Sequence, residues 1–223
     1  MEVHSNLEPR RSSDVIGVGG NDKKGFCVIL SSPSGAGKSS LAKALVEIDN
    51  NIRLSISATT RLPRSEEIDG VSYYFKSIEE FNQLIQQNAL LEYTNIYHNY
   101  YGTPKKPVEE YLSQGYNVLF DIDFPGAKSI KQMLPDSVTI FIFPPSFAIL
   151  EQRIKGRKQN SEHDINLRMK LALREMKQAD YYDYLVINDD FNTTLYAIHS
   201  IIIAERMKRS RLDLDKLLEN ILK

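Results

Sequence analysis

The sequence of 223 residues has a single cysteine, almost no net charge and no long apolar run. One cysteine, Cys27, excludes an intramolecular disulfide framework and is typical of a reducing compartment. The formal net charge of −1 provides no global field that would recruit nucleic acid or an anionic membrane. No stretch approaches the roughly 20 apolar residues that span a bilayer. We therefore expect a cytoplasmic protein that binds neither nucleic acid nor membrane.

Metal-ligand spacing and targeting signals are also missing. The four histidines, at 4, 98, 163 and 199, are scattered, and the lone cysteine offers no zinc site. Residues 1–24 are polar, without an apolar segment or a sustained period, and predict a disordered tail rather than a signal or transit peptide. Residues 25–223 are sufficient for one domain with an ample core, and no internal repeat divides them.

A candidate phosphate-binding loop lies near the start of this domain. An apolar run over 26–30 predicts a buried strand, 31–37 is small and turn-rich, and helical spacing follows from Lys38. Small residues let consecutive backbone N–H groups converge on one anion. Lys38 supplies charge for the β- and γ-phosphates, and the Ser39 hydroxyl is a ligand for Mg²⁺. The candidate phosphate-binding residues are Ser34, Gly35, Ala36, Gly37, Lys38, Ser39 and Ser40.

One residue of this loop departs from the usual pattern, because Ser32 stands where the first glycine is expected. Serine is small, so we expect the loop to tolerate it, with a more restricted backbone at that position. An ordinary Gly/Ser turn is the alternative interpretation. Gly-Lys-Ser between a predicted strand and a predicted helix favours phosphate binding.

A second group of basic and hydroxyl side chains follows the first helix. A strand is expected over 54–57, and Arg61 and Arg64 come after it. Arginine binds phosphate through two N–H groups at once, so such a pair fixes orientation as well as charge. A solvated surface is the alternative for these arginines. The tyrosines of the segment 95–103 could either pack in the core or bind phosphate, and composition favours neither. Gly102 in the same segment predicts a turn.

Three carboxylates lie in or directly after apolar runs. Glu92 interrupts the run 90–93, where burial of an unpaired charge is costly. Asp121 and Asp123 end the strand predicted over 116–123, as in a Walker B strand. Alternate strand residues share a face, so both aspartates are expected to point the same way, near the P-loop magnesium ion. Acids on a strand end that reaches solvent are the alternative.

The later chain continues the alternation of strands and helices. Strands are expected at 137–143 and 184–187, and one final helix from about 192 towards 223. The basic stretch 153–170 indicates either a solvated face or a lid over phosphates. The basic segment 206–211 is expected to face solvent or an oligomer partner. This alternation implies an α/β fold with a doubly wound parallel sheet.

A series of short motifs in this chain resembles the guanylate kinase family. They occur in the family's order from about residue 25 to the last helix. They are Ser57-Ala-Thr-Thr-Arg-Leu-Pro-Arg64, Asp69-Gly70, Tyr73, Phe75, Glu92, Asn99-Tyr-Tyr-Gly-Thr103, Asp121-Ile-Asp123, Pro144-Pro-Ser146 and Val186-Ile-Asn-Asp189. The resemblance implies a P-loop core, a GMP-binding insert over about 57–108 and a helical lid over about 153–170. It also implies Mg²⁺-dependent transfer of the γ-phosphoryl of ATP to GMP, and also to dGMP, in purine nucleotide metabolism.

The resemblance also implies roles for single residues. Lys38, Arg61, Arg157 and Arg168 would be catalytic, and Asn188 would lie near the ATP adenine. Ser39 would bind Mg²⁺, with Asp121 or Asp123 acting through water. Two departures from the family, Ser65 and Pro125, touch none of these roles. The implied GMP site comprises Ser57, Arg61, Arg64, Tyr73, Glu92, Tyr101, Thr103 and Asp121.

Two other functions are open at this point. A guanylate-kinase-like protein-binding module would keep the fold without catalysis, although such modules typically degrade the P-loop, which is intact here. A P-loop kinase of another acceptor, or a GTPase, would share the loop. The sequence has no Asn-Lys-x-Asp segment to read guanine in the GTPase manner. ATP and GMP are the expected partners, and a homodimer is one option for the oligomeric state.

Overall fold

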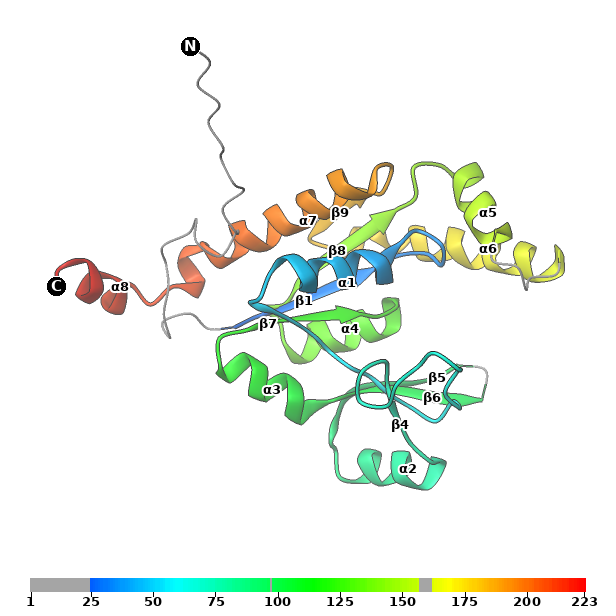
Figure 1. Ribbon diagram of the computed structural model, residues 1–223, viewed down its shortest axis with the longest axis horizontal. Coiled ribbons are helices and arrows are strands. Elements are labelled where there is room, and N and C mark those ends of the chain that lie inside the picture. The colour runs from blue at the N-terminus through cyan, green and yellow to red at the C-terminus, as the bar shows by residue number, and fades with distance from the viewer. Residues whose placement is uncertain (1–24, 97, 157–161) are drawn as a thin grey trace, which may run out of the picture.

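The computed structural model describes residues 25–96, 98–156 and 162–223 (Figure 1). The predicted tail 1–24, Tyr97 and Arg157 lie outside the described residues. A five-stranded sheet with the order β2-β7-β1-β8-β9 forms the centre, and every neighbouring pair is parallel. The predicted parallel α/β core is therefore confirmed. Its strands are β1 (Cys27–Ser31), β2 (Ile52–Leu54), β7 (Asn117–Asp121), β8 (Val138–Phe143) and β9 (Tyr184–Ile187).

Helices cover both faces of the central sheet (Figure 1). On one face, α1 (Lys38–Ile48) and α7 (Phe191–Arg206) bury Leu41, Leu45 and Ile198 against β1 and β8. On the other, α3 (Lys105–Ser113) and α4 (Phe124–Met133) bury Val108 and Ile130. Each such side chain contributes roughly 1.5–3 kcal/mol when fully buried. The sheet therefore holds β1, and the loop that follows it, rigidly between two helical layers.

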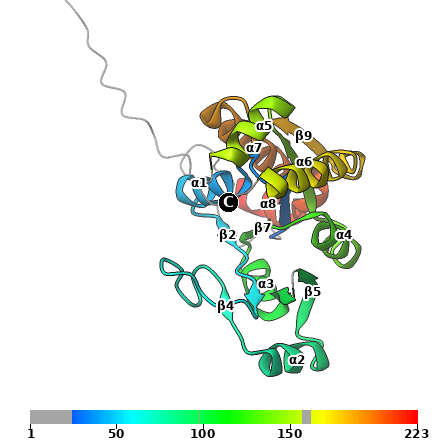
Figure 2. The same ribbon diagram turned by 90° about the vertical axis from the view of Figure 1, so that its right-hand side faces the viewer.

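A second, four-stranded sheet with the order β4-β3-β6-β5 lies to one side of the first (Figures 1 and 2). It contains β3 (Ala58–Thr59), β4 (Tyr74–Phe75), β5 (Leu90–Ile96) and β6 (Asn99–Pro104), and α2 (Ile78–Gln86) packs on it. Phe81 of α2 stacks on Tyr100 with ring centroids 5.3 Å apart. A capping box begins α2, because the Ser77 and Glu80 side chains each accept a hydrogen bond from the other's backbone N–H. Contacts between β5 and α4 join this sheet to the core.

A third small core lies between α5 (Phe147–Lys155) and α6 (Glu162–Met176). Leu150 and Ile154 of α5 pack against Met169 and Ala172 of α6. A short 3₁₀ helix, η2 (Ala179–Tyr181), leads from α6 to β9. Helices α5 and α6 project past the carboxyl end of β1 in Figure 1 and lie nearest the viewer in Figure 2. The carboxyl ends of the central strands thus face α5 and α6 on one side and the second sheet on the other.

Two local predictions about strands and turns are wrong in detail. The strand expected over 54–57 does not form, because β2 ends at Leu54 and β3 begins at Ala58 in the other sheet. Gly102 marks no turn but lies within β6, where a Cβ would come 2.8 Å from the Glu92 carbonyl oxygen. Close approach of two backbones, rather than a chain reversal, requires that glycine.

The predicted final helix is interrupted after Arg206. A 3₁₀ turn, η3 (Arg209–Arg211), precedes a separate helix, α8 (Leu214–Ile221). Arg211 turns back to Glu205 (N–O distance 3.1 Å), and its guanidinium lies 4.1 Å from the Phe26 ring centroid. A continuous helix would carry Arg211 away from both partners. No helix of the described residues has the length and apolar character to cross a membrane.

The expectation that 206–211 faces solvent or a partner is also wrong for two of its arginines. Arg206 and Arg211 expose only 15% and 12% of their side chains. Arg206 lies 2.7 Å from the buried Asp49 carboxylate, which also lies 3.0 Å from His199. Burial alone raises the pKa of Asp49, but hydrogen bonds from His199 and Arg206 hold that pKa well below its usual range. This network ties the end of α1 to α7.

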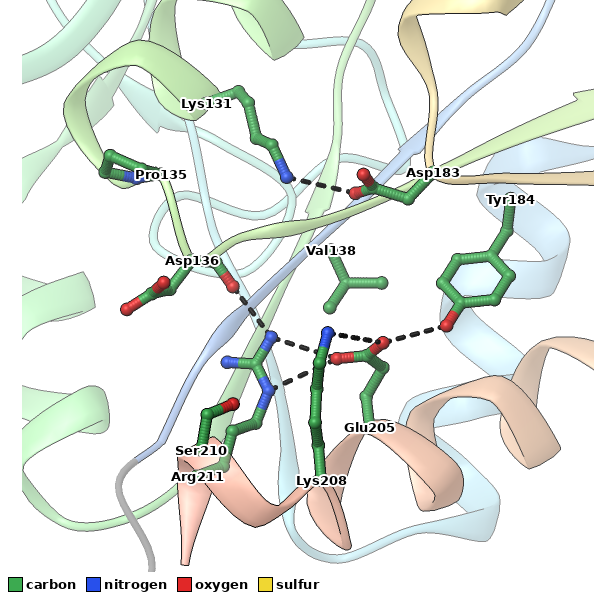
Figure 3. A pocket seen from close by; sticks show the side chains of 10 residues that line it. All are labelled: Lys131, Pro135, Asp136, Val138, Asp183, Tyr184, Glu205, Lys208, Ser210 and Arg211. Atoms are coloured by element: carbon green, nitrogen blue, oxygen red, sulfur yellow. Dashed lines mark hydrogen bonds and ion pairs between the residues drawn. The ribbon is translucent and has the colours of Figure 1, made fainter.

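A polar pocket of about 410 Å³ lies at the amino-terminal ends of β8 and β9, on the opposite edge of the sheet from the P-loop (Figure 3). Most of the charged side chains that line it form ion pairs. Lys131 lies 3.0 Å from Asp183, and Glu205 accepts the Tyr184 hydroxyl at 2.8 Å and pairs with Arg211. These contacts hold the end of α7 against the sheet.

Candidate active site

The P-loop connects the end of β1 to the start of α1. Gly35 and Gly37 have φ angles of 96° and 101°, in the left-handed region that glycine enters at little cost. Ser32 is buried and its hydroxyl donates to the Pro33 carbonyl at 3.0 Å. Ser32 is not among the residues with positive φ. Serine therefore fits where the pattern has glycine, because this position needs no left-handed backbone.

Lys38 begins α1 and its ammonium faces two carboxylates. Its Nζ lies 2.8 Å from Asp123 Oδ1 and 3.1 Å from Asp121 Oδ1. Burial alone lowers the pKa of Lys38, but the two aspartates outweigh it and raise that pKa above its usual value. Asp121 ends β7 and Asp123 precedes α4, so both point to the same side, as predicted. The arrangement places a fixed positive charge at the mouth of the P-loop.

Asn188 follows β9 and stabilises the P-loop through a hydrogen bond. Its side-chain amide is buried and donates to the Ala36 carbonyl at 2.7 Å. A Cβ at Gly37 would meet the same amide nitrogen and displace it. The positive φ angle is the firmer reason for glycine at this position. Asn188 thus lies against the P-loop, and its contact with adenine stays a prediction.

The predicted phosphate site on the second sheet is assembled around Arg61. Its guanidinium carbon lies 5.2 Å from the Tyr73 ring centroid and 5.8 Å from that of Phe75. The Tyr73 and Tyr101 rings meet edge to face at 6.2 Å, and Tyr101 also interacts with Arg61. Burial raises the pKa of Tyr73, and the charge of Arg61 opposes that shift. The sheet beside this predicted site contacts α4 through β5, and α4 directly follows Asp123 at the carboxyl end of β7.

Two other residues predicted for this site lie at its edges. Ser57 is half-buried, and its carbonyl accepts the backbone N–H of Tyr74 at 2.9 Å. Arg64 is exposed, and its backbone N–H donates to Glu67 at 2.8 Å.

Glu92 lies on β5 at the seam between the second sheet and the core. β5 pairs it with Thr103, whose buried hydroxyl donates to Glu92 Oε1 at 2.7 Å. A Cβ at Gly126, in the first turn of α4, would come 3.4 Å from Glu92 Oε2. Burial raises the pKa of Glu92, and the Thr103 hydrogen bonds oppose that shift. The half-buried Glu92 carboxylate, a hydrogen-bond acceptor, thus lies beside the N-terminus of α4.

The predicted lid is described only in part. Arg168 lies half-buried on α6, and Arg157 falls in the 157–161 gap. Arg153 of α5 donates to the Asn188 carbonyl at 3.3 Å, which links the lid to the support of the P-loop.

Sequence reasoning missed two acids that act on the predicted residues. Glu67 forms two hydrogen bonds of 2.8 Å with Arg61. Glu175, in the last turn of α6, accepts a hydrogen bond from the Ser34 backbone; burial and Asp123 raise its pKa to about 7, while Lys38 lowers it. An acid three residues after Arg64 was a weak local signal for Glu67. No local signal placed Glu175 beside the P-loop.

Comparisons with known proteins agree with this geometry. The guanylate kinase family model matches residues 24–205. The guanylate kinase of Rickettsia felis is 60% identical over 185 residues, covering 83% of this chain and 96% of that protein. The guanylate kinase of Rickettsia bellii is 59% identical over 187 residues, covering 84% of this chain and 98% of that protein. The crystal structure of guanylate kinase from Anaplasma phagocytophilum superposes with a TM-score of 0.73 at 35% identity, covering 90% of this chain and 97% of that one. The chain belongs to the guanylate kinase family.

Proposed function

We propose that this chain is an ATP:GMP phosphotransferase, which converts ATP and GMP to ADP and GDP. The observation that carries the proposal is the juxtaposition of an intact P-loop lysine with a second phosphate site. Lys38 lies 2.8 Å from Asp123, which directly precedes α4, and the first turn of α4 lies against Glu92 of the second sheet. Two phosphate sites at the same end of the central sheet suit a donor and an acceptor. The relatives named guanylate kinase, at up to 60% identity, support the same assignment.

The acceptor base is selected by Glu92. Guanine presents two donors, N1–H and the exocyclic amine, which one carboxylate accepts together. Adenine has an acceptor at N1 and no 2-amino group, so it would offer the half-buried carboxylate no donor, at a cost of roughly 1–3 kcal/mol. The Thr103 hydroxyl donates to Glu92 Oε1 in this structure, so it would have to turn away from that oxygen to donate to guanine O6.

The donor and acceptor sites align the reacting atoms. An oxygen of the GMP phosphate attacks the γ-phosphorus, and the bond to the β–γ bridging oxygen breaks, so that ADP leaves with the electron pair. Phosphoryl transfer requires the protein mainly to align the two reactants and to supply positive charge. Lys38, Arg61, Arg157 and Arg168 supply that positive charge. Closure of α5–α6 towards the second sheet excludes water and suppresses hydrolysis of ATP.

The residues at the mouth of the P-loop fit a magnesium ion bound together with ATP. No group of three or more acidic, histidine or cysteine side chains in the described part of the chain forms a metal cage. Magnesium bound with nucleotides uses one or two protein oxygens plus phosphate and water. The Ser39 hydroxyl would provide one ligand, and Asp121 or Asp123 would act through water. The bound ion supplies charge neutralisation on the transferred phosphoryl group.

Two further parts of the proposal concern the setting of the reaction. The single cysteine and the small net charge favour a cytoplasmic enzyme that acts on free nucleotides without nucleic acid or membrane. A homodimer is the remaining prediction, and light scattering after size-exclusion chromatography would test it. The protein-binding module is disfavoured because Gly35, Gly37 and Lys38 are intact.

A coupled assay of ADP release tests the proposal. GMP, dGMP, AMP, CMP and UMP are compared as acceptors, with Lys38→Ala as the negative control. We expect turnover with GMP and dGMP alone. Comparable turnover with AMP would refute the assignment of Glu92, and ADP release without any acceptor would favour an ATPase.

A further inference from the structure

The loop that carries Arg61 and Arg64 has little apolar burial to fix its shape. Leu62, Ile68 and Val71 expose 84%, 63% and 64% of their surface. Between β3 and β4 this loop contains turns and bends but no helix. Its conformation therefore depends on polar contacts, because the hydrophobic effect contributes little there.

One carboxylate, Glu67, contacts both arginines of the loop. Its Oε2 accepts Arg61 NH1 and its Oε1 accepts Arg61 NH2, each at 2.8 Å. The backbone N–H of Arg64 donates to Oε2, also at 2.8 Å. The Arg61 and Glu67 side chains are each 18% exposed, so bulk water screens the pair less than it would a surface ion pair. Hydrogen bonds from Arg61 and Arg64 lower the pKa of Glu67 to about 2.

The planar geometry of this pair fixes the orientation of the Arg61 guanidinium. A bidentate contact restricts rotation about the side-chain torsions, and the Leu62 carbonyl accepts NH1 as well, at 2.8 Å. Tyr73 lies across the guanidinium at 5.2 Å. The guanidinium is therefore held by hydrogen bonds to Glu67 and Leu62 and lies over the Tyr73 ring.

We propose that Glu67 is a positioning residue, which orients Arg61 and the Arg64 backbone so that the phosphate of the acceptor nucleotide meets a preformed site. The inference rests on the proposed function, because it assigns a role within the same acceptor site. Glu67 acts through the arginines and takes no part in the chemistry.

Two opposite effects follow from placing a carboxylate here. Its negative charge reduces the attraction of the loop for phosphate, whereas its hydrogen bonds save the cost of ordering Arg61 when the ligand binds. An arginine that is already oriented loses less side-chain entropy on binding. We infer that orientation outweighs charge, since a half-buried bidentate pair restrains the side chain strongly.

The test compares Glu67→Gln with Glu66→Gln. Both substitutions remove one negative charge from the same turn, and Glu66 is exposed. We expect Glu67→Gln to raise the KM for GMP about tenfold, which is about 1.4 kcal/mol of lost binding. The KM for ATP should stay within about twofold, and Glu66→Gln should leave the KM for GMP unchanged or slightly lower.

Two further measurements separate positioning from a merely structural role. Calorimetry should show that Glu67→Gln weakens binding of GMP but not of guanosine, because only the phosphate half is affected. In an Arg61→Ala background the same substitution should have a smaller effect on GMP binding, because only the contact of Glu67 with the Arg64 backbone remains.

Equal KM values for GMP in the two variants, or tighter GMP binding by Glu67→Gln, would overturn the inference. A parallel loss of guanosine affinity would overturn it as well. Absence of GMP-dependent turnover in the unmodified protein would instead refute the proposed function.

Discussion

Replacement of Glu92 by glutamine tests how the acceptor base is recognised. The change keeps the size of the side chain but substitutes an amide for one carboxylate oxygen. The Thr103 hydroxyl already donates to Glu92 Oε1 at 2.7 Å, so the glutamine oxygen would be retained on that side. The new NH₂ group would then face one of the two guanine donors, donor against donor, and that hydrogen bond would be lost. The variant should therefore lose affinity for GMP in particular.

The size of the loss follows from the bonds removed. A hydrogen bond to a charged group contributes about 1.5–3 kcal/mol. One such bond corresponds to a rise of roughly 10- to 150-fold in the KM for GMP. Because burial raises the pKa of Glu92, GMP binding should weaken as the pH falls towards that pKa. Glutamine does not titrate, so the variant should lack this dependence.

Steady-state kinetics with GMP and AMP as acceptors measure both effects. Glu109→Gln is the matched control, because it removes the same charge from an exposed site on α3. The preference for GMP over AMP should shrink in Glu92→Gln and persist in the control. An unchanged GMP preference, or equal losses in both variants, would show that Glu92 does not read the base.

Three further substitutions test the donor site and the framework. Lys38→Met should lower kcat on the order of 10³-fold with GMP affinity retained by calorimetry; near-normal turnover would refute the P-loop assignment. Gly102→Ala should lower the thermal midpoint by an amount equivalent to about 1–3 kcal/mol, since its Cβ would meet a backbone oxygen at 2.8 Å. Gly156→Ala is the control, with its nearest atom at 3.5 Å, and equal midpoints would contradict the packing argument. Asp49→Asn should destabilise by about 3–5 kcal/mol in chemical denaturation, because it leaves Arg206 buried without its carboxylate. The lowered pKa of Asp49 provides stability that is complete at neutral pH and is lost as pH falls below about 4, and the variant should show a shallower acid slope.

The parts of the fold that the sequence predicted well are those with strong local patterns. The apolar runs of β1, β8 and β9 have clear ends, and the structure places these strands within one residue of the predicted bounds. The two-residue strands β3 and β4 have no pattern of their own, because pairing with β6 and with each other defines them. The end of α7 depends on the contact between Arg211 and Glu205, which are partners only in the folded chain.

The residues of the candidate site are likewise of two kinds, those that a local motif predicts and those that only the folded chain brings together. Gly37 and Lys38 belong to a contiguous motif, and the parallel-sheet rule was enough to bring Asp121 to the same end of the sheet. Glu67 is close to Arg61 in sequence, yet only the turn between them reveals the bidentate pair. Glu175 reaches the P-loop because α6 folds back across the strand ends, which no local pattern indicates.

The central claim is that this chain moves the γ-phosphoryl group of ATP to GMP. The most direct measurement incubates the protein with Mg²⁺, GMP and ATP radiolabelled at the γ-phosphate, and separates the products by ion-exchange chromatography. Our account predicts that the label appears in GDP, and only when GMP is present. Label found in inorganic phosphate, or retained in ATP despite added GMP, would contradict it.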